Sequence, residues 1–206
     1  EIAQCLVGSE MCIRDRSKET DMTEFYAAGK RFPLNRTYVM GILNVTPDSF
    51  SDGGKYFDPE KAVRHAVEME AQGVDIVDIG GQSTRPGSVR ISPEEEWARI
   101  ENVVKAVAEK TNLAVSIDTF YPEVAEKALK AGAHIINDVT GFAPEMWRAV
   151  ENTDCGCIVM HPGDPDDLNG AGGNILEHVR AFFEKKTTEA EQHGVNKNRL
   201  CFDPGI

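Results

Sequence analysis

The residues from Met40 to Gly54, MGILNVTPDSFSDGG, carry more chemically useful side chains than any other part of the chain. An apolar run stops at Asn44 and breaks at Pro47, and a loop rich in hydroxyl and carboxylate groups follows. This pattern predicts a buried strand that ends in a polar loop. Binding and catalytic groups are disproportionately placed on such loops, so we expect a functional site at this strand end.

The same arrangement recurs along the chain, because six short apolar runs each end in a polar residue. These residues are Asn44, Asp78, Asp118, Asn137, His161 and Asp203. Parallel strands place their carboxyl ends on one edge, where ligands bind in both open sheets and barrels. The alternative is that Asp and Asn simply start turns after strands. That alternative explains any one of these residues more readily than it explains all of them together.

Apolar runs and helical periodicity alternate through the rest of the chain. The runs that predict strands cover residues 39–43, 74–79, 113–117, 134–136, 157–160 and 200–202. The segments that predict helices cover residues 58–72, 92–110, 122–131, 144–151 and 174–193. Regular alternation of strand and helix predicts an α/β fold with a parallel sheet.

The helix expected over residues 92–110 has the clearest start signal. Ser92, Pro93 and Glu95 form a capping box with proline at the first helical position. The consecutive acids Glu94, Glu95 and Glu96 are expected to form a solvated first turn, which the helix macrodipole favours.

Composition narrows the class of protein. The chain has 206 residues and a formal net charge of −12, which favours one domain with a large core and argues against a nucleic-acid surface. No run of apolar residues is long enough to span a membrane. The five cysteines show no CxxC spacing, so Cys155 and Cys157 are expected to be reduced core residues of a cytoplasmic protein.

The first 21 residues fit no repeating unit. The segment CLVGSEMCIRDR has no clear period and resembles a translated sequencing adaptor, the alternative being an ordinary disordered tail. We therefore expect residues 1–21 to be extraneous or disordered and residues 22–206 to form the folded α/β domain. The sequence stops at Ile206, within the loop expected after the last strand.

Several motifs together resemble the dihydropteroate synthase family. They are GILNVTPDSFSDGG (41–54), DIGGQSTRPG (78–87), SIDT (116–119), HIIND (134–138), the strand end MH (160–161) and FDPG (202–205). Their order and intervals match that family. The resemblance implies an eight-stranded (β/α) TIM barrel, of which about six units are present. It also implies the condensation of 6-hydroxymethyl-7,8-dihydropterin diphosphate with 4-aminobenzoate, giving 7,8-dihydropteroate and pyrophosphate.

The resemblance also assigns roles to individual residues. It implies that Asn44 contacts Mg²⁺ bound to pyrophosphate and that Thr84 and Arg85 hold the diphosphate and shape the aminobenzoate site. The pterin would be bound by Asp118, Asn137, Met160 and Asp203. Asn44, Asp118 and Arg85 are the expected catalytic residues. The loop expected to close over the aminobenzoate side carries Asp48, Ser49, Phe50 and Asp52.

The chemistry of these side chains suits a pterin. Its aminopyrimidinone edge presents adjacent N–H donors and a carbonyl acceptor, which two carboxylates and one amide can match. Departure of pyrophosphate leaves a methylene cation that the electron-rich ring delocalises. The task of the protein is then to stabilise the leaving group and to position the amine. Mg²⁺ prefers oxygen ligands, so an amide oxygen and substrate phosphates form a reasonable shell.

Some features depart from the family. Gln82 stands where an acidic residue often precedes STRP, so no role is assigned to it. The later lysine and the Arg-x-His group of the family lie beyond Ile206. The chain as given is therefore expected to be incomplete and inactive alone, whereas a full-length version would be a homodimer, as is common in the family. Two alternatives stay open, namely a methyltetrahydrofolate-binding domain of a methyltransferase and a non-catalytic pterin-binding fragment.

Overall fold

A computed structural model describes residues 24–46, 59–82, 89–163 and 174–205. Its main feature is a parallel sheet of six strands whose spatial order follows the chain. The strands are β3 (Met40–Asn44), β4 (Ile76–Gly80), β5 (Ala114–Asp118), β6 (Ile135–Asp138), β7 (Gly156–Met160) and β8 (Leu200–Asp203). The predicted α/β fold and the six predicted strands are confirmed.

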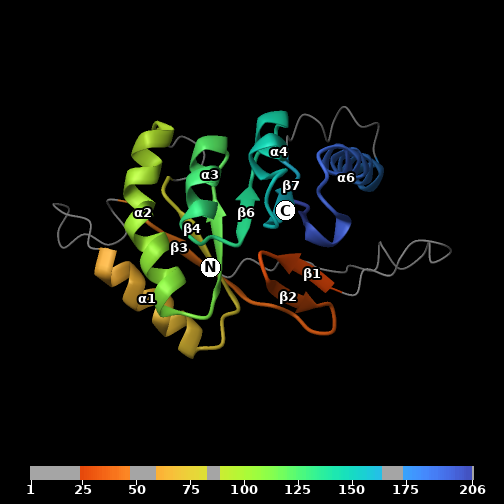
Figure 1. Cartoon of the computed structure of the whole chain (residues 1–206). Helices are drawn as coiled ribbons and strands as arrows, with labels where there is room; N and C mark the ends of the chain where they lie inside the picture. Colours follow the sequence, from red (N-terminus) through yellow and green to blue (C-terminus); the bar gives the residue numbers. More distant parts are fainter. Residues whose placement is uncertain (1–23, 47–58, 83–88, 164–173, 206) are drawn as a thin grey trace.

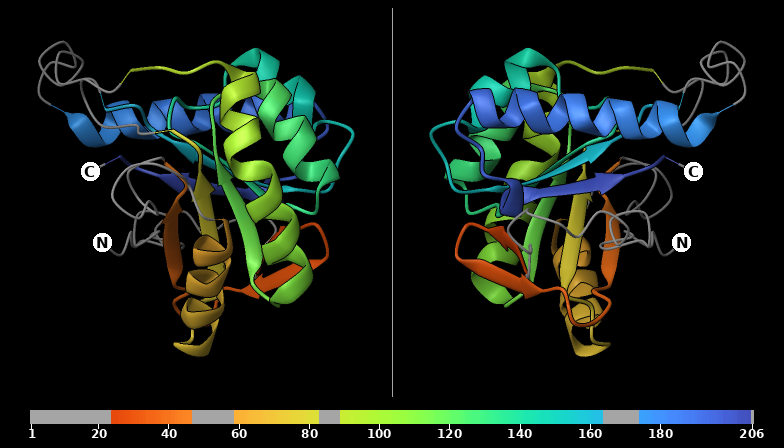
Figure 2. Two further views of the ribbon diagram at one scale, coloured as in Figure 1. Left: turned by 90° about the vertical axis from the view of Figure 1, so that its left-hand side faces the viewer. Right: turned by 90° about the vertical axis from the view of Figure 1, so that its right-hand side faces the viewer.

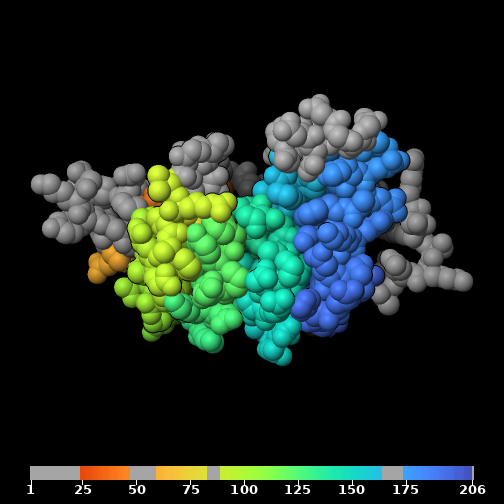
Figure 3. All heavy atoms as spheres, turned by 90° about the horizontal axis from the view of Figure 1, so that it is seen from above, coloured from red at the N-terminus to blue at the C-terminus, as the bar shows by residue number. Residues whose placement is uncertain are grey.

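Helices connect the strands and form a layer along one face of the sheet (Figure 1). They are α1 (Pro59–Ala71), α2 (Pro93–Lys110), α3 (Pro122–Lys130), α4 (Pro144–Val150) and α6 (Ile175–Gln192), and a short 3₁₀ helix, η2 (Lys197–Arg199), precedes β8. Seen from above, the helical layer runs in chain order from α2 in yellow-green to α6 in blue (Figure 3). Each β/α unit therefore packs beside the next one, as expected for part of a (β/α) barrel.

The start of α2 shows which part of the local prediction is correct. Ser92 Oγ accepts a hydrogen bond from the Glu95 backbone N–H at 3.2 Å, which confirms the cap. The expectation for Glu96 is wrong, because this side chain is fully buried against the sheet. Glu96 lies one turn before Ile100 and continues the apolar stripe of the helix, so it faces inward.

The alternating direction of strand side chains divides the apolar residues into two cores. The larger core lies between the sheet and the helices and includes Leu43, Ile79, Ile117 and Trp147. The smaller core lies on the opposite face of the sheet, which is the inner face of the barrel. It contains Met40, Ile76, Ala114, Ile135, Ile158 and Cys201 together with residues of an N-terminal hairpin.

That hairpin, β1 (Glu24–Ala27) and β2 (Lys30–Pro33), is a feature that the sequence did not predict. Its two turn residues, Ala28 and Gly29, both have positive φ, as a tight hairpin requires. Figure 2 shows it below the strands, at the end where they begin. Ala28 N–H donates to Asp154 O at 2.8 Å, immediately before β7. The hairpin thus covers the inner face at its amino end and leaves the carboxyl end as the functional edge.

Three described cysteines, Cys155, Cys157 and Cys201, are buried and form no disulfide with a described residue, which agrees with the reduced core residues expected at Cys155 and Cys157. Among the described residues, no helix is both long enough and apolar enough to cross a membrane.

The close contact between the hairpin and β7 gives a stability prediction. A Cβ atom at Gly156 would lie 2.5 Å from Phe25 Cζ and 2.8 Å from Ala27 Cβ. Gly156→Ala should therefore lower the free energy of unfolding by about 1–3 kcal/mol through overpacking. Urea denaturation measures this loss. In a Phe25→Ala background, which removes the nearest ring, the same change should cost less. An equal cost in both backgrounds would contradict the packing account.

Candidate functional site

The carboxyl ends of the first four strands of the parallel sheet bring three predicted residues together. In the strand register, Asn44 lies beside Gly80, Gly80 beside Asp118, and Asp118 beside Asn137. A Cβ atom at Gly80 would lie 3.6 Å from Asn44 Oδ1 and 3.5 Å from Asp118 Oδ2. Because Gly80 has no side chain, the two oxygen-bearing groups approach each other above it. The predicted convergence of Asn44, Asp118 and Asn137 is confirmed.

Asp78 lies two residues before Gly80 on β4, below the row formed by Asn44, Asp118 and Asn137. A hydrogen bond to Asn137 joins it to that row. Asn137 Nδ2 donates to Asp78 Oδ2 at 3.0 Å, across the intervening strand β5. Asp78 is 6% exposed. Its second oxygen, Oδ1, and Oδ1 of Asp118 are both buried without a hydrogen-bond partner among the described residues. Such orphaned acceptors are rare in folded proteins and are a reason to suspect a binding site.

Burial and like charge make these carboxyl groups unusual acids. Burial raises the pKa of Asp118 to about 8, and the nearby carboxyl groups of Asp78, Glu96 and Asp138 act in the same direction. Burial also raises the pKa of Asp78, and the polar groups of Ser116 and Asn137 only partly oppose that rise. Strongly perturbed acids that share one edge of a sheet are typical of functional sites.

The ends of β7 and β8 contribute the other two predicted pterin-binding residues that the structure describes. Met160 and Asp203 are register partners, so their half-buried side chains lie side by side. Asp203 Oδ1 accepts from the Gly205 backbone N–H at 2.9 Å. This bond fixes the turn that follows the strand, and the second carboxylate oxygen, Oδ2, has no hydrogen-bond donor among the described residues. Met160 and Asp203 thus extend the same edge.

His161 differs from the expectation that it would share this edge. Its ring is buried and packs edge-on against Phe182 of α6, with centroids 4.9 Å apart. Its Nδ1 accepts from the Gly163 backbone N–H at 3.1 Å. His161 therefore anchors α6 to the sheet, and the expectation that it joins the strand-end cluster is wrong.

A second set of contacts holds the turn that follows Asn137. Asp138 accepts hydrogen bonds from Thr140 N, Thr140 Oγ1 and Phe142 N at 2.7, 2.7 and 3.1 Å. Phe142 has a positive φ of 57°, a conformation that costs energy for a non-glycine residue and is maintained by its surroundings. Lys186 of α6 supplies part of that support, because its Nζ donates to Phe142 O at 2.9 Å.

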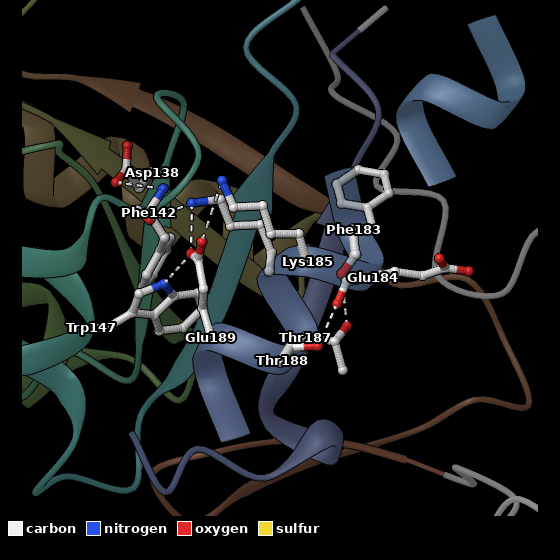
Figure 4. Close-up of polar contacts among 10 residues, drawn as sticks. Asp138, Phe142, Trp147, Phe183, Glu184, Lys185, Thr187, Thr188 and Glu189 are labelled. Atoms are coloured by element: carbon white, nitrogen blue, oxygen red, sulfur yellow. Dashed lines mark hydrogen bonds and ion pairs between the residues drawn. The ribbon is translucent and has the colours of Figure 1, made fainter. Parts of the chain in front are cut away.

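Glu189 completes this support. It accepts from Lys186 Nζ at 2.8 Å and from Trp147 Nε1 at 3.2 Å. Figure 4 shows Trp147 and Glu189 pointing toward each other, with Phe142 and Asp138 behind them. Residues of α6 and α4 thus fix the turn after β6, and with it the strand end that carries Asn137.

The Gln82 side chain makes two hydrogen bonds in the structure, although no role was predicted for it. Its Nε2 donates to Glu96 Oε2 at 3.1 Å, and its Oε1 accepts from the Ile91 backbone N–H at 3.3 Å. The buried Gln82 therefore joins the end of β4 to the start of α2. The overlooked signal in the sequence is Glu96, which lies on the apolar stripe of α2. A carboxyl group buried there requires a hydrogen-bond donor, and Gln82 supplies one.

Six of the predicted site residues lie outside the described part of the chain. They are Asp48, Ser49, Phe50, Asp52, Thr84 and Arg85. Within the described ranges, no group of three or more His, Cys, Asp and Glu side chains is placed to hold a metal ion.

A comparison with protein families now places this edge in context. The sequence model described as "Pterin binding enzyme" matches residues 40–206, which span all six parallel strands. The chain belongs to this family. The match begins at β3 and does not include the hairpin, so the strand-end residues described above all lie within it.

Curated relatives agree with the family. A dihydropteroate synthase from Clostridium beijerinckii is 43% identical over 173 residues, which are 83% of this chain and 63% of that protein. The dihydropteroate synthase of Escherichia coli strain K12 is 40% identical over 187 residues, which are 89% of this chain and 66% of that protein. The chain thus spans just under two thirds of the length of these relatives.

Solved structures show the same similarity. Dihydropteroate synthase of Xanthomonas albilineans with 4-aminobenzoic acid aligns with a TM-score of 0.78 and 39% identity, covering 89% of this chain and 66% of that one. The Burkholderia cenocepacia dihydropteroate synthase complexed with 7,8-dihydropteroate aligns with a TM-score of 0.76 and 35% identity, covering 89% and 63%. The resemblance found in the sequence motifs is confirmed.

The unusual acidity of Asp118 predicts how stability depends on pH. Its pKa is about 8 in the folded protein, against an ordinary value of 3.8. Between these values the folded chain holds a proton that the unfolded chain has lost. The free energy of unfolding should therefore fall as pH rises through this window, by at most about 1.4 kcal/mol per pH unit from this group. Asp118→Asn should make the fall shallower between about pH 5 and about pH 8, as measured by urea denaturation.

Asp75→Asn is the matched control. A hydrogen bond from Arg36 holds the pKa of Asp75 below its ordinary value, so its contribution changes only at more acidic pH. This variant should leave the slope between about pH 5 and about pH 8 unchanged. An Asp118→Asn slope equal to that of the parent protein would contradict the assignment of a raised pKa to Asp118.

Proposed function

We propose that this chain is the pterin-binding part of a dihydropteroate synthase. The proposed reaction joins 6-hydroxymethyl-7,8-dihydropterin diphosphate to 4-aminobenzoate and releases pyrophosphate and 7,8-dihydropteroate. One observation carries the proposal. Asp118 and Asn137 meet at one strand edge, where Oδ1 of Asp118 and Oδ1 of the adjoining Asp78 are buried without a hydrogen-bond partner among the described residues. The relatives with this family's motifs are named for that reaction, which favours it over methyl transfer.

The strand-end residues suit the recognition of a pterin edge. Carboxylate oxygens of Asp118 and Asp203 would accept from ring and amino N–H groups, whereas the Asn137 amide can serve one donor and one acceptor. These ligand hydrogen bonds would satisfy the acceptors that the protein leaves unpaired, so binding offsets part of the cost of burying them. Met160 would supply an apolar contact to the ring.

Asn44 would act at the diphosphate. It is exposed at the end of β3, with its amide oxygen beside the Asp118 carboxylate. Oxygen donors of this kind suit Mg²⁺, which binds proteins through few ligands and keeps waters and substrate phosphates in its shell. When bound, the ion would neutralise charge on the departing pyrophosphate. Thr84 and Arg85 would hold the same diphosphate, and the loop with Asp48, Ser49, Phe50 and Asp52 would cover the aminobenzoate.

The residues of the chain would then promote reaction by placement rather than by covalent attack. The pterin edge is fixed at the strand ends, and the amine of aminobenzoate is held against the pterin methylene carbon. The C–O bond to pyrophosphate breaks, a C–N bond forms, and the amine loses a proton. Alignment and charge stabilisation supply the rate enhancement. A homodimer and a cytoplasmic location remain expectations from the sequence.

The pterin assignment predicts a specific loss of affinity. Asp118→Ala should weaken binding of the dihydropterin diphosphate at least about tenfold, because ligand donors then lack an acceptor, a loss that typically costs about 2–5 kcal/mol. Calorimetry on the longest product that the gene encodes measures this change. Asp154→Ala, at the opposite end of the sheet, is the control and should leave affinity unchanged. Unaltered affinity in a folded Asp118→Ala protein would defeat the assignment.

The metal assignment has its own test. Pyrophosphate release from the dihydropterin diphosphate and aminobenzoate should require Mg²⁺ and should fall at least about tenfold in Asn44→Ala, because a charge-stabilising contact is lost. Asn152→Ala removes a surface amide near the opposite end of β7 and should keep the parent rate. Full activity in excess chelator would rule out the metal, whatever the fate of the pterin assignment.

A further inference from the structure

The amide of Asn137 is held in one orientation by a residue outside the expected binding set. Its Nδ2 donates to Asp78 Oδ2 at 3.0 Å, and the two residues come from β6 and β4, on either side of β5. Asp78 is buried and lies beneath the row formed by Asp118 and Asn137, so it does not share their position at the rim.

Asp78 Oδ2 accepts from the NH₂ end of the Asn137 amide, which it can do as an ionised carboxylate and, through its carbonyl oxygen, as a protonated acid. The amide oxygen of Asn137 must then point away from Asp78. No described residue donates a hydrogen bond to that oxygen, and the second N–H of the NH₂ group has no described acceptor either. Asp78 therefore decides which end of the amide is an acceptor for anything bound at the strand ends.

We propose that Asp78 is a positioning residue that sets the donor–acceptor order of Asn137 toward the pyrimidinone edge of a bound pterin. The inference rests on the proposed function. It adds a determinant of ligand specificity. An Asn137 amide that could flip would bind ligands with either order of donor and acceptor groups. A held amide accepts only ligands that place an N–H donor opposite its oxygen.

The energetic cost of Asp78 supports this role. Its Oδ1 is buried without a partner among the described residues, and Asp118, whose pKa it helps to raise, is also an acid. A neutral apolar residue of similar size would stabilise the fold more, since a buried charge without compensation is unfavourable. An acid at this place is therefore explained by what it does to Asn137 and not by packing.

A double-mutant cycle tests the proposal. Asp78→Asn keeps the size of the side chain but can donate as well as accept, so it releases the Asn137 amide. Binding of 6-hydroxymethylpterin to the longest gene product is measured by calorimetry for the parent, Asp78→Asn, Asn137→Ala and the double variant. Asp78→Asn should weaken binding about tenfold in the parent and less than about threefold in the Asn137→Ala background, because the two residues act through one contact.

Asp75→Asn is the matched control, since Asp75 is an acid directly before β4 but accepts its hydrogen bonds from Arg36 and the Val39 backbone N–H at the amino end of the sheet. Its effect on the dissociation constant should be the same with and without Asn137→Ala. If Asp78→Asn does not melt cooperatively, Asp78→Ser replaces it, because a hydroxyl also both donates and accepts.

The outcomes separate the two claims. Equal weakening by Asp78→Asn in both backgrounds, or none in either, overturns the positioning role, while binding that depends on Asn137 still supports the proposed function. A parent protein that binds no pterin overturns the proposed function and the inference with it. Coupling between Asp78 and Asn137, together with no coupling between Asp75 and Asn137, supports the positioning role.

Discussion

Burial of carboxyl groups without a countercharge is the constraint on which the rest of this structure depends. Burial raises the pKa of Asp118 to about 8, and the neighbouring charges that act on it are all negative and add to that rise. Moving a charge out of water without pairing it costs several kcal/mol. The fold supports that cost through its two apolar cores, which stabilise the sheet on both faces. A ligand with N–H donors would supply the missing partners and recover part of the cost.

Strand alternation determines where those acids lie. On the inner face of each strand, positions two residues apart share one direction, so a single strand contributes both an apolar and a polar inward residue. Strand β4 shows this most simply, because Ile76 belongs to the inner core and Asp78 belongs to the strand-end cluster. The inward-facing side chains of β4 thus change from apolar to polar between two positions that are two residues apart. The inner face of the sheet is therefore apolar at the amino ends of the strands and polar at their carboxyl ends.

The sequence was sufficient to predict the strands and the residues at their ends. Each apolar run stopped at a polar residue, and parallel order alone brings Asn44, Asp118 and Asn137 to one edge. It was not sufficient for contacts that depend on three-dimensional placement. The bond between Asn137 and Asp78 crosses an intervening strand, so its formation depends on how the side chains reach over β5. No sequence spacing encodes that distance.

Two errors have local physical causes. Glu96 was grouped with its acidic neighbours, although its place one turn before Ile100 puts it on the buried stripe of α2. The hairpin was missed because each strand has only four residues and neither contains a long apolar run. Its stability comes from contacts with residues distant in the chain, which a local pattern cannot show. Short elements that depend on tertiary packing are the hardest to predict from sequence.

The hairpin also has a consequence for the order of events during synthesis. Tyr26 Oη donates to Asp154 Oδ2 across a separation of 128 residues. At about 5–20 residues per second, the ribosome needs roughly 6–25 s to make the chain between these two positions. Throughout that interval Phe25 and Phe32 lack the part of the inner core that β7 and β8 supply, because these strands do not yet exist. The hairpin is made before the parallel strands but is among the last elements to complete its native contacts, and its aromatic side chains are exposed to other chains until then.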